Sequence, residues 1–234
     1  MELHEKDVIS AILGRRSCRA FDGAPVSEEE IQTLLACGCA APSAKNLKSC
    51  HFVTVEDKPT LTALQEAYGP GIAVADASLA VAVCVDVPDY ESRSGFRDGT
   101  WMEDGAAAMQ NLLLAARALG LEGVWLQVAN RSPREERITP ILRLPDGVRV
   151  LAVAVLGRCA PGKPGPAPTS RGFTAAPEAG LKGNSRRPKK PAKDLTEGTL
   201  STEILWITCL CCGYFSSFLG KTLGCGTHFP ARCE

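Results

Sequence analysis

Residues 101–119 constrain the fold of this chain more than any other segment, because they form a long run rich in alanine and leucine. Apolar residues at helical spacing cover almost every face, and Gly120 follows directly, in the position where many helices end. A helix that is apolar on nearly all sides is stable in water only when other elements surround it. The segment therefore predicts a buried central helix.

Shorter helices and strands are predicted on both sides of this helix. Four segments have the alternating or continuous apolar pattern of β-strands: residues 51–56, 79–85, 123–128 and 148–156. Four shorter helices are predicted from apolar spacing or a capping residue, beginning near His4, Ser27, Asp57 and Ser132. Because helices lie between strands, sheet and helix layers must pack together in an α/β or α+β sandwich. Four strands are few for such a sheet, so a further strand is expected from elsewhere.

Short sequence motifs define the starts of two predicted helices, and composition describes the segment before the central helix. Ser27 and Ser132 are each followed three residues later by a glutamate, Glu30 and Glu135, and this spacing predicts a capping box at both sites. Residues 87–100, between a predicted strand and the central helix, are short and charged, and we expect a loop there.

Composition divides the chain into three parts. Residues 1–157 are the predicted folded domain, and residues 1–156 contain 15 Lys/Arg against 21 Asp/Glu. This acidic balance does not favour nucleic acid as a partner. Residues 157–200 contain nine Lys/Arg, three Asp/Glu, seven prolines and seven glycines, so residues 158–200 are predicted to be an irregular basic linker. Residues 201–234 form a cysteine-rich apolar tail.

The tail leaves three interpretations open. Residues 204–220 are uncharged, which fits a membrane segment, but 17 residues are at the lower limit for a span. The tail cysteines and His228 are soft metal ligands, but their spacing matches no standard site, and we assign no metal. The third interpretation, which we favour over a membrane or metal role, is an extension that packs on the domain or stays poorly folded.

The start of the chain and its cysteines predict a cytoplasmic protein. Residues 1–7 are charged and lack the apolar region of a secretory signal. In the cytosol the eleven cysteines are expected to be mostly free thiols. Cys18 and the other cysteines of the folded domain are therefore expected to be small apolar fillers without a chemical role.

A basic cluster lies between the first two predicted helices, with Arg15, Arg16 and Arg19 around Ser17. Guanidinium groups donate paired hydrogen bonds to phosphate oxygens, and the serine hydroxyl adds a further donor. The cluster therefore fits a phosphate group. A solvated basic turn at the end of a helix would have the same composition.

The folded domain is poor in groups for acid–base or nucleophilic catalysis. His51 follows Cys50 on a predicted strand, so the two side chains point to opposite faces and cannot form a catalytic pair. The sequence contains no P-loop, no Gly-x-Gly-x-x-Gly turn and no His-Glu-x-x-His motif. No side chain is therefore assigned a catalytic role, and a bound organic cofactor would have to supply the chemistry.

Three blocks of the sequence resemble one family. Residues 15–21, Arg-Arg-Ser-Cys-Arg-Ala-Phe, resemble the Arg-Arg-Ser-x-Arg-x-Phe opening of the nitroreductase family of FMN-dependent oxidoreductases. Residues 41–47 are similar to the family's Ala-Pro-Ser-x-x-Asn segment, and residues 103–125 to its central helix and following strand. The blocks occur in family order. The resemblance implies a nitroreductase-like α+β sandwich of three layers, in which helices flank a mixed sheet, and a homodimer with FMN at the interface.

The resemblance also implies roles for particular residues. Arg15, Arg16 and Ser17 would hold the FMN phosphate and ribityl chain, and Arg19 would lie near N1 and O2 of the flavin. The remaining implied FMN contacts are Pro42, Ser43, Ala44 and Asn46 from the partner subunit, backbone groups of Gln127 and Val128, and a late basic residue, Arg171 or alternatively Arg158. The family's C-terminal arm usually adds a strand to the partner's sheet, which would supply the missing strand.

The activity that the resemblance implies is hydride transfer from NAD(P)H through flavin N5 to a nitroaromatic, quinone or similar acceptor, by a ping-pong mechanism. Alternatives on the same fold are dehalogenation, azoline oxidation, flavin fragmentation, or flavin binding without turnover. One departure bears on this choice. The chain has Lys48-Ser49-Cys50 where the family commonly has Gln-Pro-Trp, so the acceptor pocket is expected to differ.

Overall fold

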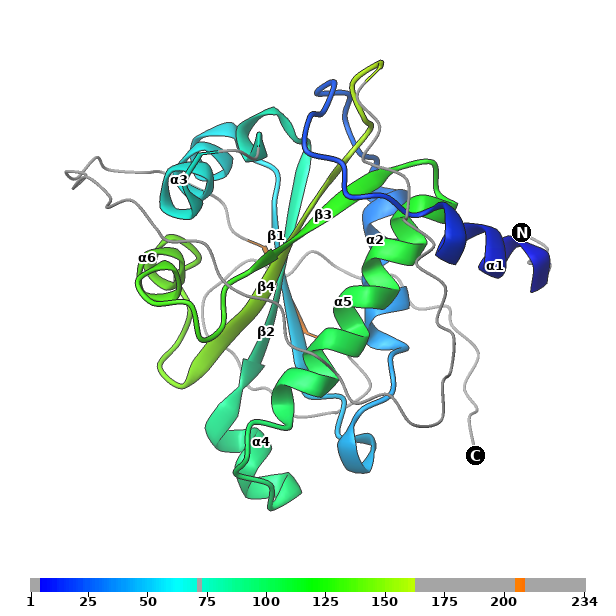
Figure 1. Ribbon diagram of the computed structural model, residues 1–234. Coiled ribbons are helices and arrows are strands. Elements are labelled where there is room, and N and C mark those ends of the chain that lie inside the picture. Colours follow the sequence, from blue (N-terminus) through cyan, green and yellow to red (C-terminus); the bar gives the residue numbers. More distant parts are fainter. Residues whose placement is uncertain (1–4, 71–72, 163–204, 209–234) are drawn as a thin grey trace, which may run out of the picture.

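A single antiparallel sheet forms the centre of the molecule (Figure 1). The computed structural model describes residues 5–70, 73–162 and 205–208. Five strands lie in the order β3-β4-β2-β1-β5: β1 is Cys50–Val55, β2 Leu79–Asp86, β3 Glu122–Gln127, β4 Val148–Gly157 and β5 Leu205–Thr208. All pairings between these strands are antiparallel. Within the described ranges, parallel pairing is confined to one bridge, between Ser17 and Gly123.

Helices cover both faces of the sheet (Figure 1). They are α1 (Glu5–Gly14), α2 (Glu28–Cys39), α3 (Lys58–Tyr68), α4 (Val87–Ser94), α5 (Trp101–Ala118) and α6 (Arg134–Ile141). On one face α2 packs against α5, and α1 lies against α5 as well; on the other face α3 packs beside α6. The predicted sandwich of helix, sheet and helix layers is therefore observed.

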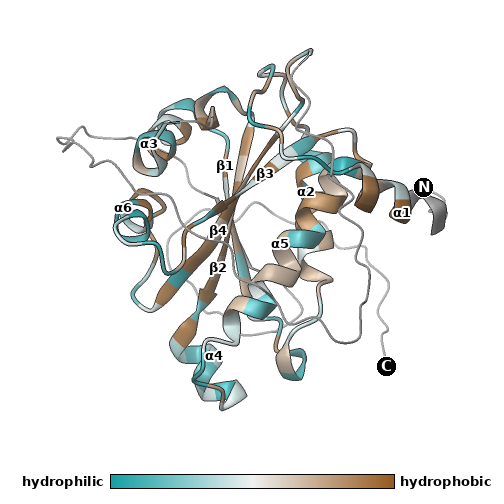
Figure 2. Cartoon of the chain, viewed as in Figure 1, coloured by the Kyte–Doolittle hydropathy of each residue, from teal (hydrophilic) through white to brown (hydrophobic). Residues whose placement is uncertain are grey.

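Each face of the sheet has its own apolar core, as expected when alternate residues of a buried strand point to opposite sides. On the α5 face, Phe52 and Val83 of the sheet pack with Leu112 of α5. On the α6 face, Val53 and Ala82 pack with the side chains of α3 and α6. Figure 2 shows the apolar strands inside and polar residues on the outer helices. The continuous apolar run of β2 is thus explained by burial on both faces.

Helix α5 confirms the predicted central helix. It begins at Trp101 and ends at Ala118, and Gly120 follows with a left-handed φ of 75°. Leu112 and Met109 have no exposed surface. Close packing explains one glycine of the helix: a Cβ on Gly105 would lie 2.7 Å from Cδ2 of Leu151, so a larger residue would require the Leu151 side chain or the helix to shift.

The prediction of a loop between β2 and α5 is wrong, because a helix, α4, forms there. Asp86 caps it by accepting a hydrogen bond from the Asp89 N–H at 3.0 Å, and Gly95 ends it with a φ of 77°. Tyr90 is buried beneath the helix, with 1% of its surface exposed. A cap and one buried aromatic stabilise a short helix whose charged sequence suggested a loop.

The two predicted capping boxes have different outcomes. At α2 the box is present: Glu30 N–H donates to the Ser27 hydroxyl, and Ser27 N–H donates to the Glu30 carboxylate. At α6 it is absent, because the helix starts one residue later than predicted and Pro133 occupies the capping position. Pro133 has no side-chain acceptor, and the Ser132 hydroxyl instead donates to Glu136 at 2.7 Å.

The fifth strand, β5, pairs antiparallel with β1 of the same chain. The resemblance implied a different arrangement, in which a C-terminal strand of one subunit pairs with the sheet of its partner; that exchange stays a prediction. Most of the predicted linker and the cysteine-rich tail lie outside the described residues, so their boundaries and the interpretations of the tail stay predictions. Among the helices of the described ranges, none combines the length and the apolar character that a membrane crossing requires.

Candidate functional site

The basic cluster lies where α1 ends and β3 begins. Ser17 pairs with Gly123 at the start of β3, and the Cys18 N–H donates to the Gly123 carbonyl at 3.2 Å. Gly123 also allows β3 to pack closely on β4, because a Cβ there would lie 2.9 Å from the Val155 carbonyl. Backbone hydrogen bonds therefore fix the loop that carries Arg15, Arg16 and Arg19.

The three arginines of the cluster are not neutralised. Arg16 donates to the Leu13 carbonyl at 2.8 Å and to that of Arg15 at 3.0 Å, and Arg19 donates to the Ser17 carbonyl at 3.3 Å. Within the described part of the chain, none of the three forms an ion pair with a carboxylate. Positive groups on a fixed loop, without counter-charges among the described residues, have the chemistry to attract an anion.

Arg158, the alternative phosphate contact, has other partners. Its guanidinium donates to Glu30 Oε1 at 3.0 Å and to the Pro25 carbonyl at 3.0 Å. An arginine already bonded to a carboxylate is a weaker candidate for a second anion, which argues against Arg158. That residue, Arg171, lies outside the described residues and stays a prediction.

Cys18 is not a free thiol, which corrects the prediction from the sequence. It forms a disulfide with Cys159, with a Cα–Cα distance of 6.1 Å, and it has no exposed surface. Two backbone hydrogen bonds reinforce the link, from Asp22 N–H to the Arg158 carbonyl and from Ala160 N–H to the Ala20 carbonyl, both 3.0 Å. The cluster is thus tied to the segment after β4. The 141-residue separation gave no local signal of this pairing.

We predict that removing this disulfide destabilises the protein by about 2–4 kcal/mol, because it closes a long loop in the unfolded chain. The measurement is denaturant unfolding of Cys159→Ser and of the unchanged protein with and without dithiothreitol. Cys37→Ser, which removes an unbonded thiol from α2, is the control. An unchanged unfolding midpoint in Cys159→Ser would contradict the prediction.

The second predicted segment, residues 41–47, lies largely in a tightly wound loop, which we call the 42–48 loop. Lys45, Asn46 and Lys48 have positive φ values of 49°, 54° and 51°, which are uncommon outside glycine. The Lys48 N–H donates to the Ser43 hydroxyl at 2.9 Å and closes the loop. Unfavourable backbone conformations of this kind persist only where surrounding contacts enforce them, and they gather at functional sites.

Contacts with two neighbouring helices hold this loop in place, and neither contact was predicted from the sequence. Asp104, a buried carboxylate in the first turn of α5, accepts a hydrogen bond from the Ala44 N–H at 2.9 Å and from the Ser49 hydroxyl at 3.4 Å. The Lys45 ammonium donates to the Ser94 carbonyl of α4 at 2.6 Å. The available signal was an acid, Asp104, in the first turn of a helix that was predicted to be buried.

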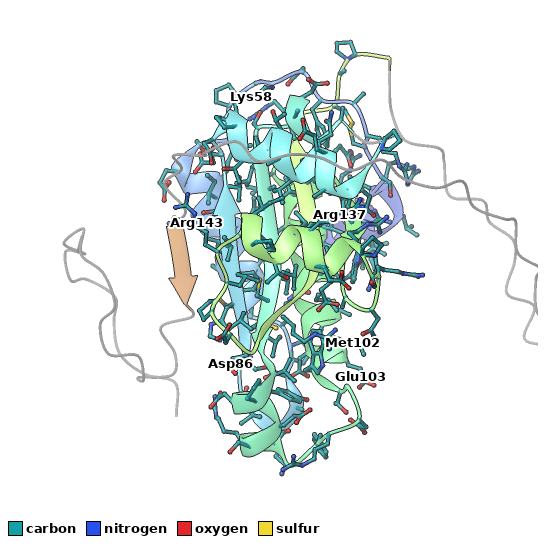
Figure 3. All side chains as sticks on the ribbon, turned by 90° about the vertical axis from the view of Figure 1, so that its left-hand side faces the viewer. Lys58, Asp86, Met102, Glu103, Arg137 and Arg143 are labelled. Carbon is teal, nitrogen blue, oxygen red and sulfur yellow. A yellow bond between two sulfur atoms is a disulfide. The ribbon has the colours of Figure 1, made fainter. Side chains whose placement is uncertain are left out.

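Asp104→Ala is expected to destabilise the protein by about 1–3 kcal/mol, because it leaves the Ala44 N–H without its acceptor. Asp104→Asn, which keeps an oxygen for that N–H, should lose less. Glu103→Ala is the matched control, since Glu103 is an exposed acid on the same turn (labelled in Figure 3). Denaturant unfolding measures all three, and equal losses from Asp104→Ala and Glu103→Ala would contradict this role.

The third predicted contact lies at the far end of β3. The Gln127 carbonyl accepts from Arg134 at 2.9 Å, and the Val128 N–H donates to the Leu151 carbonyl at 3.2 Å. These backbone groups are therefore already bonded, and Val128 has a fully buried side chain. The amide of Gln127 accepts from the Trp125 indole at 3.2 Å. These backbone groups would contact a flavin ring only in addition to the hydrogen bonds that they already form.

The structure arranges the predicted residues along α5 and β3. The arginine cluster lies beside Gly123 at the start of β3, where α1 meets α5 (Figure 1). Gln127 lies about 13 Å further along, at the usual rise of an extended strand. The 42–48 loop is held by Asp104, near the N-terminal end of α5, and Asn130, just after β3, contacts Met102 in the same region. The arginine cluster, predicted to bind the phosphate, and Gln127, predicted to contact the flavin ring, therefore lie at opposite ends of β3.

Two titrating groups near the loop are shifted by their surroundings. Burial raises the pKa of the Tyr90 hydroxyl, and the charge of Asp104 raises it further, so this phenol stays protonated. Burial lowers the pKa of His51, although Asp86 and Asp89 partly oppose the effect. Burial therefore favours the neutral form of the His51 imidazole.

Comparison with known proteins gives consistent matches to one group. A family model described as "Nitroreductase family" matches residues 12–98 and 74–158. A protein of Archaeoglobus fulgidus with the provisional name NADH dehydrogenase/NAD(P)H nitroreductase is 35% identical over 152 residues, which are 65% of this chain and 85% of that protein.

Solved structures agree with these matches. NADPH:FMN oxidoreductase of Vibrio harveyi, complexed with NAD+, superimposes with a TM-score of 0.63 at 25% identity, covering 76% of this chain and 80% of the other. An FMN-dependent nitroreductase of Clostridium difficile gives a TM-score of 0.58 at 28% identity, covering 64% and 87%. These neighbours confirm the predicted fold class.

Proposed function

The chain belongs to the nitroreductase family, and we propose that it passes electrons from NAD(P)H to a nitroaromatic, quinone or similar small acceptor. It is an NAD(P)H-dependent flavin oxidoreductase with FMN as its cofactor. One observation supports the assignment of the site: Arg15, Arg16 and Arg19 form a fixed cationic cluster that has no carboxylate partner among the described residues.

The donors of this cluster fit the phosphate of FMN. Arg15 and Arg16 would donate charge-assisted hydrogen bonds to the phosphate, and the Ser17 hydroxyl would add another. Arg19 would place positive charge near the pyrimidine side of the ring, where it favours the reduced, more negative cofactor. We assign Arg171 as a further phosphate contact.

When bound, FMN supplies the hydride and electron transfer, so no side chain of the protein needs to act as a nucleophile. The protein's part is to position the reactants and limit their motion. We propose that Pro42, Ser43, Ala44 and Asn46 contact the ring, on the loop that Asp104 and Ser94 hold in place. Gln127 and Val128 would approach it at the end of β3.

We propose that the protein is a homodimer and that the 42–46 contacts come from the partner subunit. The support is helix α1, whose residues Val8, Ile9, Ile12 and Leu13 expose between 47% and 65% of their surface. Four neighbouring apolar residues on one amphipathic helix are typical of a protein–protein interface. A cytoplasmic location stays a prediction.

Steady-state kinetics test the proposed reaction. Protein loaded with stoichiometric FMN is mixed with NADH or NADPH and a nitroaromatic or quinone acceptor, and coenzyme oxidation is followed. A ping-pong mechanism gives parallel double-reciprocal lines when both substrates are varied. Intersecting lines would contradict the alternating mechanism, and flavin-loaded protein that oxidises neither coenzyme would support flavin binding without turnover.

A further inference from the structure

A second cationic site lies on the opposite face of the sheet from α5. A cleft of about 400 Å³ opens between the end of α3 and the start of α6. Its lining includes Tyr68, Gln127, Arg131, Ser132, Arg134 and Arg137. We call it the arginine cleft; Figure 3 views this side of the molecule and labels Arg137 on α6. Its volume is in the range of small-molecule sites.

Arg134 is held rigidly at the centre of the arginine cleft. Its guanidinium carbon lies 3.9 Å from the centre of the Tyr68 ring, and one guanidinium nitrogen donates to the Gln127 carbonyl at 2.9 Å. Stacking and a hydrogen bond together fix the position of this charge without neutralising it.

Arg131 and Arg137 add two further charges. Both are exposed, and within the described ranges neither is paired with a carboxylate. Of the two acids in the first turn of α6, Glu135 pairs with Arg149 at 2.8 Å, whereas Glu136 accepts from the Ser132 hydroxyl at 2.7 Å and keeps its charge. The three arginines that line the cleft outnumber this carboxylate, so the described groups leave it with net positive charge.

This cleft is separate from the cluster assigned to the FMN phosphate. The FMN cluster lies at the start of β3, beside Gly123, whereas the arginine cleft lies at its end and includes Gln127. Gln127 is also the residue proposed to approach the flavin ring. The cleft thus begins next to the proposed hydride-transfer position and extends outward between α3 and α6.

We propose that the arginine cleft binds the adenosine 2′-phosphate of NADPH and makes the enzyme prefer NADPH to NADH. The proposal rests on the proposed function, because a coenzyme that delivers hydride to a ring near Gln127 must direct its adenosine end away from it. A phosphate monoester carries up to two negative charges and binds guanidinium groups through paired hydrogen bonds. NADH lacks this phosphate, so the arginine cleft does not increase its binding affinity.

Direct binding tests the site apart from turnover. Adenosine 2′,5′-bisphosphate and adenosine 5′-monophosphate are titrated into the protein by calorimetry, with and without FMN. We expect the 2′-phosphorylated probe to bind at least about a hundredfold more tightly, as for two charge-assisted contacts. Arg131→Ala and Arg137→Ala should each reduce that preference by about tenfold or more. Equal affinities for the two probes would overturn the proposal.

Coenzyme kinetics and a control variant complete the test. Arg131→Ala and Arg137→Ala should raise the KM for NADPH and leave that for NADH unchanged. Arg97→Ala removes an exposed arginine at the distant end of α4, and it should change neither value. If Arg97→Ala has the same effect, general electrostatics and not the cleft sets the preference. Selective probe binding to protein that never retains FMN would support the cleft and contradict the proposed function.

Discussion

Arg15→Ala/Arg19→Ala is expected to fold normally but to lose FMN on dialysis. Each substitution removes a charge-assisted contact worth about 1.5–3 kcal/mol, or about one to two decades in affinity. The double variant should therefore bind FMN about two to four decades more weakly, if the effects add. Flavin content after dialysis and the Kd from fluorescence quenching measure the loss.

The fold should survive because, among the described residues, neither side chain is bonded to another helix or strand. Arg19 donates only to its neighbour Ser17 in the described structure, so its loss should change the free energy of unfolding by less than about 0.5 kcal/mol. Arg97→Ala controls for the loss of positive charge. Arg19→Lys keeps the charge but loses the planar fork, and it should bind FMN with intermediate affinity. Retention of full flavin content by the double variant would overturn the placement of the phosphate.

Leu112→Ala is expected to have the largest effect on stability, about 2–5 kcal/mol. Leu112 lies in the middle of α5 with no exposed surface, and its Cδ2 is 3.3 Å from the position that a Cβ on Gly38 of α2 would occupy. The substitution therefore leaves a cavity where α5 meets α2 and the sheet, and the close backbones limit collapse around it.

Denaturant unfolding at a fixed protein concentration measures this loss, because subunit association would otherwise shift the midpoint. Gln110→Ala is the matched control, since Gln110 is exposed on the same helix. The control should stay within about 0.5 kcal/mol of the unchanged protein. A loss below about 1 kcal/mol in Leu112→Ala would contradict the description of α5 as the centre of the core.

The elements with strong local signals were predictable from the sequence. Apolar periodicity located α5 and β2, because burial on all sides leaves a continuous pattern in the chain. The α2 capping box was found from Ser27 and Glu30, which bond within one helical turn. At α6 the same pattern was misleading, because Pro133 took the capping position and Ser132 turned to Glu136.

Features that depend on distant residues were not predictable. The Cys18–Cys159 disulfide joins residues far apart in sequence, and helix α4 depends on burying Tyr90 under a charged segment. The candidate site shows the same division. The arginine cluster and the 42–48 loop were visible as motifs, but the hydrogen bond from Ala44 to Asp104 and the arginine cleft arise only when the chain folds.

Size-exclusion chromatography with light scattering and visible absorbance gives the most direct test of the central claim, that the cluster around Arg15 and Arg19 binds FMN in a dimer. Each chain has a mass of 24.8 kDa. We predict one yellow peak with the mass of two chains and one flavin per chain. A colourless peak with the mass of a single chain, unchanged after incubation with FMN, would contradict the account.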